Sequence, residues 1–96
     1  MTEQILSVRF DSRKSFYNKA HVIDEGGNKI TLRSYNTEVA FIENGIPHVL
    51  GTWSQTTLRH IKEFLKQNGF KAESKKQILE DYSSHLGSSK KYIIVN

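Results

Sequence analysis

The segment WSQTTLRHIKEFLKQNGF, residues 53–70, constrains the fold most strongly, because it specifies a helix together with both of its ends. Ser54 provides a hydroxyl that accepts a hydrogen bond from a first-turn amide, as helix N-caps do. Gly69 stands where helices commonly end in a left-handed residue, and Phe70 is placed to fold back as in a Schellman ending. The apolar residues recur at the spacing of one helical face: Leu58, Ile61, Phe64 and Leu65.

The residues before this helix indicate an antiparallel sheet, because short alternating runs are separated by turn residues. Asn44-Gly45 is the strongest hairpin signal, since a two-residue type I′ turn needs positive φ at both positions. The glycines of Glu25–Asn28 close another hairpin. The first strand would place Leu6, Val8 and Phe10 on one face. We predict strands over Ile5–Phe10, Tyr17–Asp24, Lys29–Tyr35, Thr37–Glu43 and Ile46–Trp53.

A second helix is predicted from Ser74 to about Leu86, because Ser74 and Gln77 have capping-box spacing. Its apolar face would consist of Ile78, Leu79, Tyr82 and Leu86. The β-prone segment Lys90–Val95 forms either a sixth strand or a short tail packed on the domain. We therefore expect an α+β fold, with an N-terminal antiparallel sheet of about five short strands followed by two helices. At 96 residues, the chain is expected to form a single domain, residues 1–96.

Composition excludes several kinds of site. The chain has no cysteine, so disulfides, thiolate zinc sites and cysteine nucleophiles are absent, which fits a reducing compartment. No apolar run approaches the roughly 20 residues needed to span a bilayer, and the N-terminus lacks the apolar stretch of a signal peptide. We expect a soluble cytoplasmic protein that does not bind membranes.

The net charge of +4 is unevenly distributed along the chain. Residues 1–53 contain six Lys or Arg and six acidic residues, whereas the remainder contains eight Lys or Arg and four acidic residues. Arg59, Lys62 and Lys66 form a basic stripe beside the apolar face of the predicted helix. This half should attract nucleic acid or an acidic protein surface. A solvated lysine-rich helix surface explains the same pattern without a partner.

No residue pattern amounts to a catalytic or metal-binding signature. The spacings of His21, His48, His60 and His85 match no ligand motif, so ordinary surface or half-buried histidines are expected. His60 and Glu63 are neighbours at i, i+3, which suits either a base–carboxylate pair or, more commonly, a simple surface contact. We expect a protein that is not an enzyme and that needs no cofactor or metal.

Two classes of binding function share the basic surface. Nucleic acid could contact the cations through phosphates and stack bases on exposed aromatic rings, although aromatic residues at these spacings are more often core. A small rigid domain could instead place the same surface against an acidic groove of a larger protein. The predicted partner-binding residues are Arg59, Lys62, Lys66 and Lys71, with Tyr35, Asn36 and Trp53 as adjacent contacts.

Two blocks of sequence carry a family resemblance. LRSYNTEVAFIENG followed by GTWSQTTLRHIKEFLKQNGF resembles small proteins of unknown function carried by phages, plasmids and other mobile elements of Gram-positive Firmicutes. The shared pattern is an SYxTxVA strand, an NG turn and a TTxRHIxEFLxQxGF helix, over roughly residues 16–71. The resemblance implies that this protein is carried by a mobile element. Mobile-element proteins of this size include anti-CRISPR inhibitors of type II effector nucleases.

In that setting, the leading hypothesis is an anti-CRISPR inhibitor that binds a type II CRISPR effector nuclease or its guide RNA complex in the bacterial cytoplasm. Such an inhibitor needs no active site, because it only has to occupy a surface that the effector uses. A net basic protein is poorly suited to mimic DNA. The alternative hypothesis is a small basic nucleic-acid-binding protein that regulates the element's own genes or replication.

Overall fold

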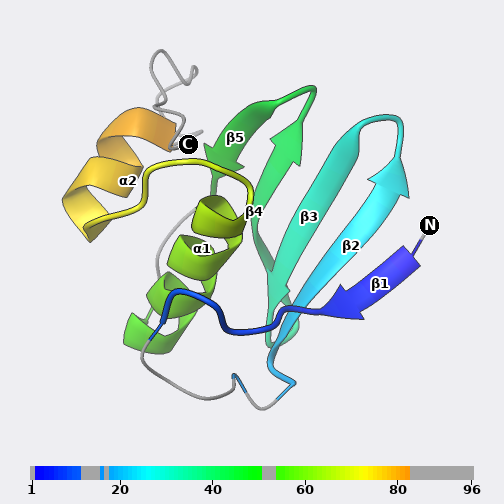
Figure 1. Cartoon of the computed structure of the whole chain (residues 1–96), viewed down its shortest axis with the longest axis horizontal. Helices are drawn as coiled ribbons and strands as arrows, with labels where there is room; N and C mark the ends of the chain where they lie inside the picture. Colours follow the sequence, from blue (N-terminus) through cyan, green and yellow to red (C-terminus); the bar gives the residue numbers. More distant parts are fainter. Residues whose placement is uncertain (1, 12–15, 17, 51–53, 83–96) are drawn as a thin grey trace.

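The computed structural model of the chain describes residues 2–11, 16, 18–50 and 54–82. Within these residues, an N-terminal antiparallel sheet of five strands is followed by two helices, which confirms the predicted α+β fold (Figure 1). Strands that are consecutive in the sequence are neighbours in the sheet. The elements are β1 (Thr2–Ile5), β2 (Ala20–Gly26), β3 (Lys29–Ser34), β4 (Thr37–Glu43), β5 (Ile46–Val49), α1 (Gln55–Gln67) and α2 (Lys75–Tyr82).

The hairpin turns have positive φ angles where the sequence provides residues that tolerate them. Asn44 (φ 53°) and Gly45 (φ 79°) form the turn between β4 and β5, as predicted. Gly27 (φ 59°) and Asn28 (φ 66°) connect β2 to β3. Tyr35, expected at the end of a strand, instead lies in the turn between β3 and β4 with a φ of 57°.

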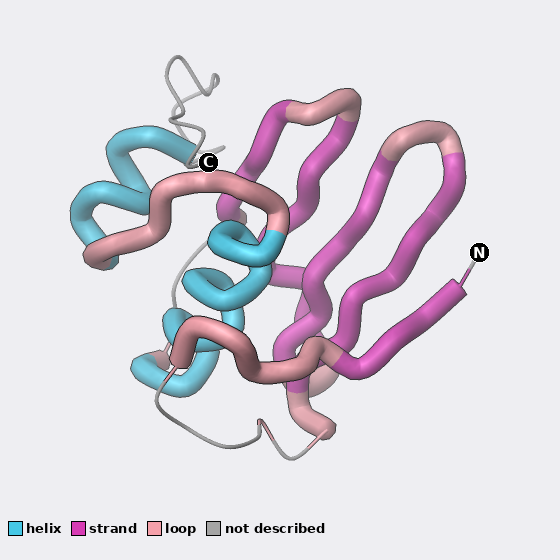
Figure 2. The backbone as a smooth tube through the Cα atoms, viewed as in Figure 1, coloured by secondary structure: helices cyan, strands magenta, loops and turns pink. Residues whose placement is uncertain are grey.

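The first strand differs from its prediction. β1 covers Thr2–Ile5 and pairs with β2, whereas the apolar alternation predicted a strand over Ile5–Phe10. The amides of residues 9–11 donate to the Glu63 carboxylate in α1, so they are not available to a neighbouring strand. The chain therefore leaves the sheet after Leu6 and continues alongside α1 (Figure 2).

Other predicted boundaries can be compared only in part. β2 begins at Ala20, later than the predicted start at Tyr17. β5 ends at Val49, earlier than the predicted end at Trp53. Tyr17, residues 51–53, the predicted end of the second helix at Leu86, and Lys90–Val95 lie outside the described residues.

Both predicted ends of α1 are confirmed. Ser54 is the N-cap, and its Oγ accepts the N–H of Thr57 at 3.1 Å. At the other end, the Phe70 N–H donates to the Leu65 carbonyl at 2.9 Å, while Gly69 has a φ of 87°. These are the bonds of a Schellman motif, so the helix ends where its sequence indicates.

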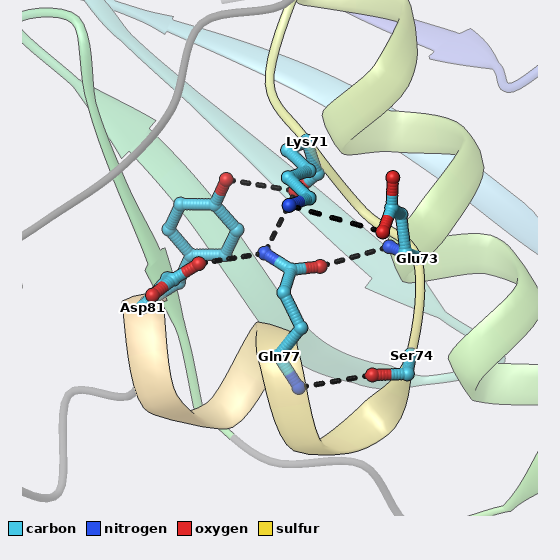
Figure 3. A network of polar contacts seen from close by, with 6 residues as sticks. Lys71, Glu73, Ser74, Gln77 and Asp81 are labelled. Carbon is cyan, nitrogen blue, oxygen red and sulfur yellow. Dashed lines mark hydrogen bonds and ion pairs between the residues drawn. The ribbon is translucent and has the colours of Figure 1, made fainter.

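α2 starts with the predicted pairing of Ser74 and Gln77 (Figure 3). Ser74 Oγ accepts the Gln77 N–H at 3.1 Å, and Gln77 Oε1 accepts the N–H of Glu73 at 2.8 Å. In a capping box, the Gln77 side chain would accept the N–H of the N-cap residue Ser74. Here it accepts the N–H of Glu73 instead, one residue earlier. Gln77 Nε2 also donates to Asp81 Oδ2 at 2.8 Å, which fixes the side chain along the helix.

Both helices lie on the same side of the sheet, with α1 against β3 and β4 and α2 against β5 (Figures 1 and 2). The predicted apolar face of α1 is confirmed, since Ile61, Phe64 and Leu65 are fully buried and Leu58 packs against them in part. This packing leaves the other sides of α1 available to carry polar residues. The core between the layers includes Ala20, Leu32, Ala40, Val49, Ile61, Phe64, Leu65, Ile78 and Tyr82.

Candidate functional site

The three cations of the predicted stripe lie around one shallow hollow on α1. Arg59, Lys62 and Lys66 occupy positions i, i+3 and i+7, so they follow one side of the helix. We call these three residues the α1 basic surface. The hollow has a volume of about 40 Å³, and it is lined by Phe10, Asp11, Arg59, Lys62, Glu63 and Lys66.

Arg59 is partly committed to an ion pair within the protein. Its Nη1 lies 2.9 Å from Asp11 Oδ1, and the Asp11 side chain is only 10% exposed. This bond ties the N-terminal segment to α1 across 48 residues of sequence. Arg59 therefore has a structural role, and less of its charge is available to a partner.

Lys62 and Lys66 provide the uncompensated charge of the α1 basic surface. Both are half-buried, a setting in which lysine side chains typically keep their methylene stems against the protein and their ammonium groups in solvent. In the described part of the chain, neither lysine forms an ion pair. An anionic partner would thus meet two cations without displacing a carboxylate from them.

Glu63 lies beneath this surface and accepts a set of backbone hydrogen bonds. Its side chain is only 1% exposed. Its Oε2 accepts the Arg9 N–H at 3.0 Å, and its Oε1 accepts the N–H groups of Phe10 and Asp11 at 2.9 and 3.0 Å. Gln67 Nε2 adds a fourth bond to Oε2 at 2.6 Å. The carboxylate is thereby satisfied inside the protein.

His60 and Glu63 do not form the predicted surface pair. His60 is fully buried, and its Nδ1 lies 2.8 Å from Ser34 Oγ on β3. Its ring contacts Phe16 edge-to-face at 4.6 Å between centroids. The two side chains thus bond to different segments, Glu63 to residues 9–11 and His60 to β3. The expectation of surface or half-buried histidines is wrong for His60, because the helix turns this residue towards the sheet.

The other described histidines are half-buried, as expected. His21 Nδ1 lies 2.8 Å from Glu3 Oε2, and its Nε2 lies 2.9 Å from the Asn18 carbonyl oxygen. His48 stacks on Phe41 with 4.6 Å between ring centroids. Among the described residues, no group of three or more His, Asp or Glu side chains is placed to hold a metal ion.

Lys71 does not line the hollow. It lies between α1 and α2, and its Nζ is 3.8 Å from Glu73 Oε1 (Figure 3). Its carbonyl accepts the Tyr82 hydroxyl at 2.7 Å and Gln77 Nε2 at 3.3 Å. Its backbone thus attaches the connecting segment to α2, and its predicted role as a partner contact rests on its side chain alone.

Tyr35 and Asn36 lie in the turn between β3 and β4 and do not line the hollow either. Tyr35 is 48% exposed, with its ring 5.9 Å from that of His60. The third predicted neighbouring contact, Trp53, lies outside the described residues. Of the predicted site, the structure therefore brings together Arg59, Lys62 and Lys66 around the hollow.

Phe10 is the residue that sequence analysis missed. Its alternation with Leu6 and Val8 predicted a strand position on their face, yet its side chain is 56% exposed at the edge of the hollow. The sequence holds no local signal for this, because the polar run that breaks the alternation begins at Asp11, well after the end of β1 at Ile5.

Comparisons with known proteins place the chain in a family. In the described part of the chain, no helix is long and apolar enough to cross a membrane. No curated protein and no solved structure matches the chain. One family model, described as a family of unknown function, matches residues 5–80, from the end of β1 into α2. Because this match covers more than half of the sequence, the chain belongs to the DUF8033 family.

Proposed function

We propose that this protein is a non-enzymatic binding protein whose α1 basic surface contacts phosphate groups of a nucleic acid or of a nucleic-acid–protein complex. The carrying observation is that Lys62 and Lys66 flank one hollow and form no ion pair within the described residues. Lysine ammonium groups bind phosphates as point charges, so they suit a polyanionic backbone.

The hydrogen bonds beneath this surface support binding in place of catalysis. A general base needs access to the proton that it removes. Glu63 already accepts four hydrogen bonds and is buried, while His60 is fully buried against β3. Both side chains serve the fold. Asp11, the other carboxylate that lines the hollow, is paired with Arg59 and only 10% exposed, so it is not placed as a free base either.

The mobile-element resemblance narrows the proposal to one kind of partner. We propose that the protein acts in the bacterial cytoplasm as an anti-CRISPR inhibitor, binding the guide RNA complex of a type II effector nuclease. A net basic protein is suited to contact exposed guide RNA, because the phosphates of that RNA carry the opposite charge.

A regulator of the element's own genes is the second candidate, since the same lysines would contact plain DNA or RNA. The two functions differ in an effector cleavage assay. An inhibitor lowers target cleavage when it is added to the assembled effector complex, whereas a regulator binds nucleic acid without affecting cleavage.

Charge reversal tests the binding surface. We expect Lys62→Glu with Lys66→Glu to weaken binding to guide RNA and to the effector complex by about tenfold or more, because two phosphate contacts are lost. The matched control is Lys75→Glu with Lys76→Glu, which changes the net charge equally at exposed positions of α2. We expect that control to change affinity by about twofold or less, because screening weakens distant charges.

Fluorescence anisotropy with labelled RNA and circular dichroism of each variant provide the measurements. If the folded Lys62 and Lys66 double variant binds and inhibits as the wild type does, the α1 basic surface is not the binding site. If both double variants weaken binding equally, the attraction depends on net charge and not on this surface.

A further inference from the structure

Phe10 is an exposed aromatic residue within a basic surface. Its side chain is 56% exposed and lines the same hollow as Lys62 and Lys66. Burial of a phenylalanine side chain stabilises a protein by roughly 1.5–3 kcal/mol, so the fold gains little from a Phe at this exposed position. A contact with a partner would use the apolar area that folding leaves uncovered.

The backbone that carries Phe10 is held in place from several directions. The amides of Arg9, Phe10 and Asp11 all donate to Glu63, with distances of 2.9–3.0 Å. The Asp11 side chain is bonded to Arg59 at 2.9 Å. On the N-terminal side of residues 9–11, the Ser7 carbonyl accepts a hydrogen bond from Gln67 Nε2 at 2.6 Å. The position of this backbone is thus fixed before any ligand binds, which lowers the entropy cost of using it.

An aromatic ring beside lysines suits one ligand chemistry in particular. Single-stranded nucleic acids bind proteins through bases stacked on aromatic side chains and phosphates placed near cations. In a duplex, the bases remain stacked inside and cannot cover a phenyl ring in this way. An apolar peptide would use Phe10 but gain nothing from Lys62 and Lys66, and an acidic peptide would use the lysines only.

We propose that Phe10 is a base-stacking residue, so that the α1 basic surface prefers single-stranded over double-stranded nucleic acid. The ring would cover the face of one unpaired base, while Lys62 and Lys66 contact the adjoining phosphates. This inference rests on the proposed function, because it names the ligand class of the same surface.

The test uses the full chain and two labelled probes, a single-stranded oligo(U) of about 12 nucleotides and a duplex of similar length. We expect Phe10→Ala to weaken oligo(U) binding by about tenfold, while duplex affinity changes by about twofold or less. Phe10→Trp should retain or increase oligo(U) affinity. Phe10→Leu keeps an apolar side chain but has no aromatic face, so it should bind as weakly as Phe10→Ala.

The outcomes separate this inference from the proposed function. If Phe10→Ala binds oligo(U) like the wild type while the Lys62 and Lys66 double variant does not, stacking is wrong and phosphate binding remains. If Phe10→Leu retains full affinity, the contact is apolar and stacking is wrong. If the wild type binds neither probe nor the effector complex, the proposed function is wrong, and the stacking inference that rests on it is wrong as well. An unchanged urea midpoint shows that each Phe10 variant is folded.

Discussion

The carboxylate of Glu63 takes the place of a strand partner for three consecutive amides. Arg9 and Phe10 end the alternating run that predicted a strand, but the N–H groups of residues 9–11 all donate to this one side chain. A carboxylate is a stronger acceptor than a peptide carbonyl, so it can gather several amides at one point. The N-terminal segment therefore bends over α1 and leaves the sheet at Leu6.

Replacing Glu63 should destabilise the protein strongly. Glu63→Ala leaves three amides without their acceptor, so we expect a loss of about 2–4 kcal/mol in the free energy of unfolding. Glu63→Gln should lose less, because the amide oxygen still accepts while the amide nitrogen does not. Urea denaturation measures both effects.

The exposed Glu80 on α2 provides the control for that experiment. Glu80→Ala should change the free energy of unfolding by about 0.5 kcal/mol or less, as surface substitutions usually do. If Glu63→Ala has an equally small effect, the bonds to residues 9–11 do not hold the N-terminal segment in solution.

The candidate site was predictable where it depends on one helix and unpredictable where it depends on distant partners. Periodicity alone places Lys62 and Lys66 on one side of α1. By contrast, Asp11 lies 48 residues from Arg59, and Phe10 lies 53 residues from Glu63. No local sequence pattern indicates which groups will bond to each other across such separations. Phe10 and the pairing of Arg59 were therefore found only in the structure.

At the level of elements, the ends of helices and hairpins followed their sequence signals. Ser54, Gly69 and Asn44-Gly45 each act through their own backbone or that of residues a few positions away. Such local effects are visible in a short window of sequence. The limits of β1 depended instead on a contact with α1, and for that reason the prediction was wrong there.

The end of α1 offers a direct test of this local reasoning. Gly69→Ala should lower the free energy of unfolding by about 1 kcal/mol, because its φ of 87° is unfavourable for a side chain with a Cβ. Gly69→Asn should cost less, since asparagine tolerates the left-handed region. Urea denaturation of the three proteins gives the ranking. Equal stability of the alanine variant and the wild type would show that the Schellman ending contributes nothing.

At the level of the whole molecule, the layered arrangement separates stability from charge. The helices bury their apolar faces against one side of the sheet, and the buried core provides most of the stability. The excess positive charge lies after residue 53, in the part of the sequence that contains both described helices. Folding and binding thus depend on different physical forces, so they should respond differently to ionic strength.

Salt should therefore weaken binding far more than it changes stability. Ion pairs between described residues lie mostly at partly exposed positions, so the free energy of unfolding should change by about 1 kcal/mol or less between about 50 and 500 mM salt. Two single-strand phosphate contacts, by Lys62 and Lys66, give a slope of log affinity against log salt of about −1.4, or a loss of about 25-fold over that range. Anisotropy titrations and urea denaturation at matched salt concentrations measure the two quantities. An affinity that does not change with salt would indicate apolar docking on a protein surface, which contradicts phosphate recognition by α1.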